Sequence, residues 1–497
     1  MRYCSTRDAG INVSSAHAIA QGIARDGGLF TPVALPRLTA AQLESMRSMT
    51  YAQRAEIVLR LFLTDYTDDE IHDCVVRAYT PAKFGGENPA PLHKLDDARG
   101  VLELWHGPTC AFKDMALQIL PHLLTCALKK EQTDRTAVIL VATSGDTGKA
   151  ALEGFHDVPG TRMMVFYPER GVSNMQKRQM ISQEGGNVAV CAVRGNFDDA
   201  QSAVKTIFTN RAILERLADN GMQFSSANSI NWGRLLPQIV YYFSAYCDWF
   251  ADRPEAFGSP INFVVPTGNF GNILAGYYAK RMGLPVHRLI CASNENNVLT
   301  DFIRTGHYDR RRLFYTTESP SMDILISSNL ERLLFDLNGH DSAQIANYMN
   351  QLVLNGEYQA EPALMASLRE TFYGDYCTDM EGRAAIADAF ADDRYLIDPH
   401  TAVAAGVYRK YVRNTEDPTE TVIVSTASPY KFADSVLRAV AVNVPDDDFA
   451  RLDALAAATG TEIPAPLRAL RDKPVRFTDV CDKNRLADAV CRQLQLK

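Results

Sequence analysis

Short apolar runs alternate with longer amphipathic stretches over most of the chain. The runs, rich in Val and Ile, predict strands at residues 101–105, 137–142, 163–167, 188–193, 261–265, 288–292 and 421–425. Apolar residues at helical spacing predict helices at residues 115–129, 198–218, 235–250 and 275–282. Uninterrupted apolar runs are typical of strands buried on both faces, so this alternation predicts an α/β fold in which helices cover parallel-type sheets.

The first 95 residues follow a different pattern. Apolar residues at helical spacing predict helices over residues 40–63 and 68–78. A stretch rich in proline and glycine at residues 80–91 predicts a loop or linker. We therefore expect a mainly helical N-terminal domain over residues 1–95.

Composition narrows the possible partners and locations. The chain has 497 residues and a net charge of −8, which argues against nucleic acid as its main partner because such proteins usually carry a basic surface. The sequence has no apolar run long enough to cross a membrane and no secretory signal, so we expect a cytoplasmic protein with no membrane partner. None of the ten cysteines has the C-x₂-C spacing of a zinc site, so we expect reduced cysteines and no metal.

The loop after the first predicted strand of the α/β region contains a lysine. Ligands of α/β folds bind in the loops at the carboxyl ends of the strands, and this loop reads HGPTCAFKD at residues 106–114. The positive end of the helix dipole opposes a lysine at a helix start. Lys113 is therefore either a surface lysine paired with Asp114 or a partly desolvated lysine of lowered pKa that can form a Schiff base.

Two further loops have the residues of anion-binding sites. TSGDTG at residues 143–148 and PTGNFGN at residues 266–272 each combine glycines with polar side chains ahead of a predicted helix. Glycine lets the backbone approach an anion closely, and a helix N-terminus attracts negative charge. Either loop alone is also compatible with a turn that binds nothing, but together with Lys113 they favour a phosphate-binding site.

Two polar segments add candidates. SSANSINWGR at residues 225–234 places hydroxyls, amides and Arg234 ahead of a helix, and an arginine fork suits a phosphate. TASPYKF at residues 426–432 follows the last predicted strand. The alternatives are an ordinary helix cap with a solvated arginine, and a turn broken by proline.

As a set, these motifs resemble those of threonine synthases, in particular the longer form with an N-terminal domain. The resemblance extends to about residue 435, with further matches at YCSTRDAG (3–10), DGGLFTP (26–32), GNFDDAQ (195–201) and SPSMDILISSNLERLLF (319–335). It implies the two-lobed pyridoxal-phosphate fold type II that this family shares with the tryptophan synthase β-subunit. It also implies a lyase of threonine biosynthesis, which converts O-phospho-L-homoserine and water into L-threonine and phosphate.

The resemblance implies a division of the chain as well. Residues 96–143 and 226–497 would form a large cofactor-binding domain, and residues 144–225 a small mobile α/β lobe. We expect a monomer or a homodimer.

Roles for individual residues follow from the same resemblance. Lys113 would hold pyridoxal phosphate as a Schiff base and act as the catalytic base. The cofactor would also contact Asp146, Thr426 at its pyridine nitrogen and, through its phosphate, Gly268, Asn269, Phe270, Gly271 and Asn272. The substrate would be bound by Ser144, Thr147, Asn228, Ser229, Asn231 and Arg234.

The sequence departs from the family pattern at one residue, and two alternative functions stay open. Many family members have histidine where this chain has Ser428, so any acid–base role of that histidine is absent here. A phospho-lyase or a serine/threonine ammonia-lyase on the same fold would differ in its product. A non-catalytic protein that binds phosphate metabolites would lack the Schiff base.

Overall fold

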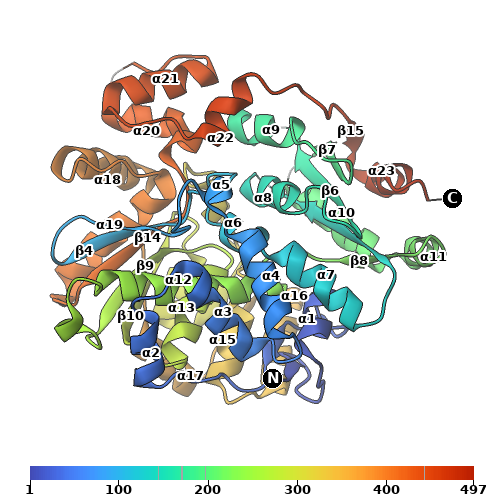
Figure 1. The fold of residues 1–497 in the computed structure, drawn as a ribbon, viewed down its shortest axis with the longest axis horizontal. Coiled ribbons are helices and arrows are strands. Elements are labelled where there is room, and N and C mark those ends of the chain that lie inside the picture. The colour runs from blue at the N-terminus through green and yellow to red at the C-terminus, as the bar shows by residue number, and fades with distance from the viewer. Residues whose placement is uncertain (144, 170–171, 196, 442, 497) are drawn as a thin grey trace.

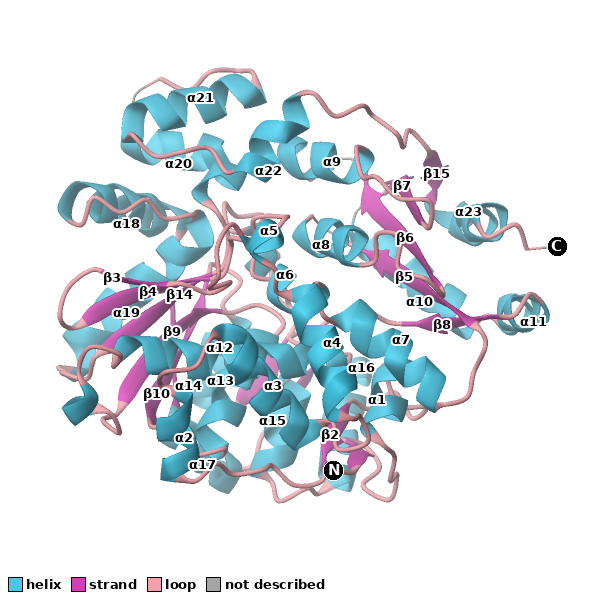
Figure 2. Ribbon diagram, in the orientation of Figure 1, coloured by secondary structure: helices cyan, strands magenta, loops and turns pink. Residues whose placement is uncertain are grey.

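Two largely parallel sheets, each flanked by helices, form the two lobes of the molecule (Figures 1 and 2). The computed structural model describes residues 1–143, 145–169, 172–195, 197–441 and 443–496. Each predicted strand is present, and its ends lie within two residues of the predicted ones. The predicted α/β architecture is therefore confirmed.

The larger sheet lies among helices on both faces. Its six strands follow the order β13 (Phe372–Tyr376), β10 (Val286–Ser293), β9 (Ile261–Pro266), β14 (Thr421–Ser425), β4 (Arg99–Glu103) and β3 (Leu92–Lys94), and only β3 is antiparallel to its neighbour. Val265 packs in the core that includes α12 (Trp232–Trp249) and α13 (Gly271–Arg281), whereas Val264 packs with Val403 of α19 (Pro399–Thr415). This two-sided burial explains why the strands are apolar without alternation.

The smaller sheet has five strands, all parallel. Their order is β15 (Val480–Asp482), β7 (Val188–Arg194), β6 (Thr161–Pro168), β5 (Thr136–Ala142) and β8 (Met222–Ser225). The surrounding helices are α8 (Asp146–Gly154), α9 (Asn174–Ile181), α10 (Phe197–Thr209), α11 (Arg211–Asp219) and α23 (Leu486–Gln493). The predicted helix over residues 198–218 is interrupted where Asn210 caps α11.

The strand pairing differs from the predicted division in two places. A boundary at residue 143 leaves β5 in the large domain, but β5 pairs with β6 and β8 of the smaller sheet. Residues 480–482, also placed in the large domain, form β15 at the edge of the smaller sheet. A three-residue strand has no periodicity of its own, so only its long-range pairing with β7 identifies it.

Helices dominate the N-terminal part. They are α1 (Ser15–Gln21), α2 (Ala40–Met46), α3 (Tyr51–Phe62), α4 (Asp68–Ala78) and α5 (Pro81–Phe84), beside the antiparallel pair β1 (Tyr3–Ser5) and β2 (Phe30–Pro32). The predicted helix over residues 40–63 is two helices, because Thr50 forms a capping box with Gln53 and starts α3 anew. The rings of Tyr3 and Phe62 pack on Trp232 of α12, so these helices share the core of the larger lobe.

The other helices and strands are α6 (Asp114–Leu117), α7 (Leu120–Lys130), α14 (Val298–Thr305), β11 (His307–Asp309), α15 (Leu330–Leu337), α16 (Ser342–Leu354), β12 (Glu357–Gln359), α17 (Pro362–Thr371), α18 (Asp379–Asp392), α20 (Ala433–Val440), α21 (Asp448–Thr459) and α22 (Ala465–Arg468). The 3₁₀ helices include η2 (Pro320–Met322) and η3 (Pro429–Phe432). In the part of the chain that the structure describes, no helix combines the length and apolarity needed to span a bilayer. All ten cysteines are free.

Gly154 lies where α8 meets α6. A Cβ atom at this position would lie 1.9 Å from the carbonyl oxygen of Leu117, a backbone atom with little freedom to move aside. We expect Gly154→Ala to lower the free energy of unfolding by about 2 kcal/mol or more, as measured by urea denaturation. Gly382→Ala in α18 is the matched control, since nothing lies within 4 Å of the added methyl group. It should be neutral or slightly stabilising, and equal losses for both variants would contradict this explanation.

Candidate active site

Three loops bring three charged side chains together between the sheets. Lys113 follows β4, Asp146 begins α8 after β5, and Lys431 lies in η3 after β14. The Nζ atom of Lys113 lies 3.7 Å from Asp146 Oδ2, and the Nζ atom of Lys431 lies 2.6 Å from Asp146 Oδ1. All three side chains are buried. Because each residue follows a parallel strand, the cluster forms where the carboxyl ends of the two sheets face each other.

The amine of Lys113 is desolvated. Burial lowers the pKa of this amine to about 8, Asp146 opposes the shift, and the positive charges of Arg234 and Lys431 add to it. Asp114 does not pair with the lysine, because its carboxylate accepts hydrogen bonds of 2.8 Å from both the backbone N–H and the hydroxyl of Thr109. The structure therefore favours the desolvated lysine over the surface ion pair.

Asp146 is ionised despite its burial. Burial by itself raises the pKa of this carboxyl, but the charges of Lys431 and Lys113 bring it well below its usual range. Gln176 Nε2 also donates a hydrogen bond of 2.9 Å to Asp146 Oδ1. Lys431 was not among the predicted site residues, because nothing in the motif TASPYKF marks its lysine as buried.

A histidine that sequence reasoning missed holds the loop beside Lys113. The Nε2 atom of His400 accepts a hydrogen bond of 3.2 Å from the backbone N–H of Ser321, and its Nδ1 atom lies 2.6 Å from Asp398 Oδ2. This geometry assigns the ring proton to Nδ1. The Ser321 hydroxyl in turn accepts a hydrogen bond of 3.3 Å from Lys113 Nζ and lies 3.4 Å from Asp146 Oδ2.

The loop between β9 and α13 forms a cup of backbone N–H groups. Phe270 has a φ of 61°, and the helix begins at the next residue. Within the described part of the chain, the N–H groups of residues 268–272 have no hydrogen-bond acceptor. Asn272 Nδ2 is buried and also unpartnered, while its Oδ1 accepts hydrogen bonds from the hydroxyls of Tyr241 and Tyr242. Unpaired donors at a helix start suit an anion.

Ser321 links this cup to Lys113. A Cβ atom on Gly268 would lie 2.8 Å from the carbonyl oxygen of Ser321, so the cup and the lysine flank the same residue. Ser327 Oγ donates a hydrogen bond of 2.7 Å to the Gly268 carbonyl. The segment SPSMDILISS at residues 319–328 therefore contacts both Lys113 and the cup.

Thr426 lies beside the loop that carries Lys113. The backbone N–H of Phe112 donates a hydrogen bond of 2.8 Å to the Thr426 carbonyl, and the hydroxyl of Thr426 makes no hydrogen bond among the described residues. Ser428, which stands in place of the family's histidine, is buried and accepts a hydrogen bond from Tyr430 N. Its hydroxyl therefore caps η3.

Arg234 is the predicted substrate residue with an uncompensated charge. It is buried, and no carboxylate in the described residues forms an ion pair with it. Its Nη1 atom donates a hydrogen bond of 2.8 Å to the Ala227 carbonyl, and burial lowers its pKa to about 10. The other predicted substrate residues Thr147, Asn228 and Ser229 are half-buried, and Ser144 lies outside the described residues.

Asn231 has a structural role instead of the predicted one. Its Nδ2 atom donates hydrogen bonds to the carbonyls of Ile19 and Ser226, at 3.0 and 2.8 Å. Its Oδ1 atom accepts a hydrogen bond from Gly233 N and caps α12. Both ends of the side-chain amide are thus bound within the protein.

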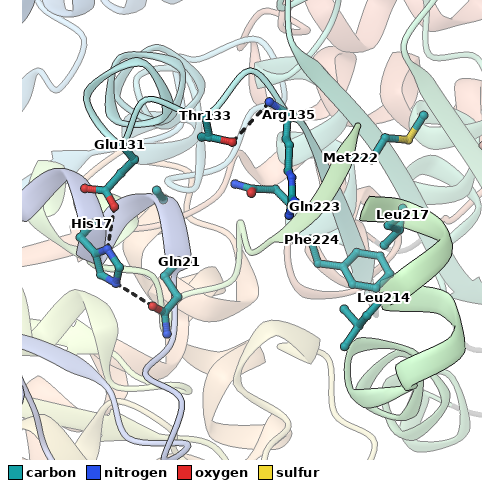
Figure 3. Close-up of a pocket in the computed structure, with 11 residues that line it drawn as sticks. His17, Gln21, Glu131, Thr133, Arg135, Leu214, Leu217, Met222, Gln223 and Phe224 are labelled. Atoms are coloured by element: carbon teal, nitrogen blue, oxygen red, sulfur yellow. Dashed lines mark hydrogen bonds and ion pairs between the residues drawn. The ribbon is translucent and has the colours of Figure 1, made fainter. Parts of the chain in front are cut away.

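Two other features lie apart from this cluster. A pocket of about 480 Å³ between α1, β8 and α11 is lined by none of the predicted site residues (Figure 3). His307, Asp309 and Glu357 bring potential metal-ligand atoms within 4.8 Å of one another. The guanidinium of Arg311 forms ion pairs with both of these carboxylates, so a cation of the protein already offsets part of their charge.

Three protein-family models match the chain. They are described as Threonine synthase N terminus, over residues 2–79, Pyridoxal-phosphate dependent enzyme, over residues 84–428, and Threonine synthase, C-terminal, over residues 401–490. The threonine synthase of Pseudomonas aeruginosa is 38% identical over 439 residues, which cover 88% of this chain and 90% of that protein. The chain belongs to the threonine synthase family.

Solved structures from the threonine synthase family have the same fold. A pyridoxal-phosphate-bound threonine synthase from Brucella melitensis is 36% identical and superposes with a TM-score of 0.88 over 99% of both chains. Threonine synthase from yeast superposes with the same TM-score at 31% identity, again over 99% of both chains. Human threonine synthase-like 1 is 42% identical over 86% of this chain, but the chain spans only 58% of the length of that relative.

The buried carboxyl of Asp114 predicts a pH dependence of stability. Burial raises its pKa from 3.8 to about 7. A raised carboxyl pKa contributes stability at low pH that is lost as the pH rises from about 4 to 7. Asp114→Asn removes this titration, so the variant should gain stability relative to the parent protein over that range, measured as the difference between their urea unfolding free energies. Parallel pH profiles for the two proteins would show that Asp114 does not titrate there.

Proposed function

We propose that this protein is a threonine synthase, which converts O-phospho-L-homoserine and water into L-threonine and phosphate with pyridoxal phosphate as cofactor. The observation that carries the proposal is the buried Lys113 amine, of lowered pKa, beside a cup of unpaired backbone donors. Membership of the threonine synthase family supports it.

The residues present fit the cofactor. Covalent attachment of an aldehyde requires an amine of which an appreciable fraction is uncharged near neutral pH, and the phosphate requires donors without internal partners. Lys113 meets the first requirement, and the cup at residues 268–272, with the orphaned Nδ2 of Asn272, meets the second. Contacts of Ser321 on both sides bring the two within reach of one small molecule.

Lys113 would hold the cofactor covalently, and Gly268, Asn269, Phe270, Gly271 and Asn272 would hold its phosphate. When bound, pyridoxal phosphate supplies an electron sink for negative charge on the substrate carbon next to the amino group. Thr426 would present a neutral hydroxyl to the pyridine nitrogen and so would not keep a proton on that atom as a carboxylate would. Asp146 would lie beside the cofactor on the side of the smaller lobe.

Lys113 also serves as the base. With the cofactor bound, the amine of Lys113 would take the proton from Cα of the substrate and then one from Cβ, as phosphate departs from Cγ. Lys113 would return one proton to Cγ before water adds at Cβ and one to Cα afterwards, and the proton released by the water would leave with the phosphate. Its lowered pKa favours this exchange, because it raises the uncharged fraction of the amine near neutral pH and only the uncharged amine can accept a proton.

Arg234 would bind the phosphate of the substrate, with Ser144, Thr147, Asn228 and Ser229 beside it. A buried guanidinium without a carboxylate partner among the described residues is a favourable site for a dianion. Thr147 lies in the first turn of α8, after β5, and Asn228, Ser229 and Arg234 lie between β8 and the first turn of α12. We propose that residues 144–225 form a mobile lobe that closes when the substrate phosphate bridges the two sheets, and so excludes water.

We further propose a cytoplasmic monomer or homodimer that acts on this small molecule and not on nucleic acid. The ten free cysteines and the net charge of −8 support this part of the proposal.

Lys113→Ala tests the attachment of the cofactor. The variant should lose the visible absorbance of the lysine-bound cofactor, which borohydride removes from the parent protein, together with nearly all turnover. Lys129→Ala, which changes an exposed lysine in α7, should keep both. Full activity of Lys113→Ala would exclude Lys113 as the attachment site. Formation of 2-oxobutyrate in place of threonine by the parent protein would indicate an ammonia-lyase.

Arg234→Ala tests the substrate-phosphate site. Loss of one charge-assisted hydrogen bond costs roughly 1.5–3 kcal/mol, so kcat/KM for O-phospho-L-homoserine should fall by about 10- to 150-fold. The absorbance of the bound cofactor should not change. Arg211→Ala, on the exposed surface of α11, is the control and should leave kcat/KM unaltered. An unchanged kcat/KM for Arg234→Ala would remove this arginine from the site.

A further inference from the structure

The carboxylate of Asp146 lies between two lysines. Lys431 Nζ lies 2.6 Å from one oxygen, and Lys113 Nζ lies 3.7 Å from the other. The shorter contact belongs to the lysine that has no role in the proposed reaction. Asp146 is therefore bound primarily to Lys431.

Lys431 is held in place on two sides. Its side chain is fully buried, and its ammonium also donates a hydrogen bond of 2.9 Å to the carbonyl of Thr109. Thr109 belongs to the loop that carries Lys113, and its hydroxyl and N–H bind Asp114. Lys431 thus connects the loop after β14, the loop after β4 and the first turn of α8.

The charges of Asp146 and Lys431 affect the protonation of Lys113. A buried carboxylate 3.7 Å from an amine stabilises the protonated amine, which is neither a nucleophile nor a base. The charge of Lys431 offsets that effect, because the Lys431–Asp146 pair is neutral as a unit. The charged groups that face Lys113 are Asp146 from α8, Lys431 from η3 and Arg234 from α12. Asp114 is the adjacent carboxyl on the lysine's own helix.

We propose that Lys431 is a positioning residue which keeps Asp146 neutralised, so that the Lys113 amine is available in its uncharged form. This inference rests on the proposed function, because it concerns the lysine that would hold the cofactor. Lys431 acts on Lys113 through Asp146 and needs no contact with the substrate.

Competitive labelling of the full-length protein, freed of cofactor, tests this inference without turnover. Trace acetic anhydride reacts only with uncharged amines, and mass spectrometry of the peptide that contains Lys113 gives its reactivity from pH 6 to 10. The parent protein should show a midpoint near pH 8. Lys431→Met should raise the midpoint by about one unit or more, which is a tenfold loss of uncharged amine at pH 7. Lys431→Arg retains the charge and should stay near the parent value.

A second pair of variants tests the route through Asp146. Asp146→Asn should lower the midpoint of Lys113, because it removes the carboxylate that stabilises the protonated amine, while the positive charges of Lys431 and Arg234 remain. The double variant Asp146→Asn/Lys431→Met should return close to the parent value. An unchanged midpoint in Lys431→Met, or an upward shift that persists in the double variant, would overturn the inference. If Lys431→Met does not fold, Asp146→Asn serves as the test. A lowered midpoint of Lys113 supports the inference, and an unchanged or raised midpoint overturns it.

The same variants separate this inference from the proposed function. The holoenzyme of Lys431→Met should show the acidic limb of its kcat/KM profile moved to higher pH, with a smaller loss of activity at pH 9 than at pH 7. If the parent protein makes no threonine but the labelling shifts occur as described, the proposed function fails and the charge pairing stands.

Discussion

The amine of Lys113 lies away from water, where the carboxyl ends of two sheets meet, and a charged ammonium there is costly. This cost is what lowers its pKa to about 8. It arises only when both lobes are in place, because the burial of Lys113 depends on loops from each of them. The larger sheet contributes the lysine and the cup, and the smaller sheet contributes Asp146.

Each acidic group of the site has partners of its own. Lys431 neutralises Asp146, and Thr109 donates two hydrogen bonds to Asp114 within its own loop. Arg234 has no carboxylate partner among the described residues. The electrostatics of the described residues therefore favour anions at two places, at Arg234 and at the cup before α13. A substrate and a cofactor that each carry a phosphate match this number.

Segments far from the site hold the smaller lobe. The carbonyls of Ala20 and Ile19, at the end of α1, accept hydrogen bonds from Ser225 Oγ and Asn231 Nδ2, which flank the chain between the lobes. At the other edge, β15 pairs with β7. The N-terminal helices and the C-terminal strand thus both constrain a lobe whose closure the proposed reaction uses. In the proposed closure, this lobe would move between these two attachments.

The sequence by itself determined seven of the strands, the three loops and Lys113. A parallel strand buried on both faces is an uninterrupted apolar run, and a phosphate loop needs glycine and hydroxyl residues in a short local order. These signals lie within about ten residues of chain, so β9 and the loop at residues 266–272 were predictable. The capping box that divides α2 from α3 was also local, but helical periodicity alone runs through it.

Tertiary structure decided which side chains meet. Lys431 contacts Asp146, and His400 contacts Ser321, across more than 75 residues of chain. No local pattern distinguishes a buried lysine or histidine from an exposed one. The amide of Asn231 suggested a ligand for phosphate because amides donate hydrogen bonds, yet it donates to the backbone carbonyls of Ile19 in α1 and of Ser226. The short strands β8 and β15 exist only because longer neighbours offer them unpaired edges. Hydrogen bonds and ion pairs depend on distance in space, and for these residues that distance is set by the packing of the two sheets.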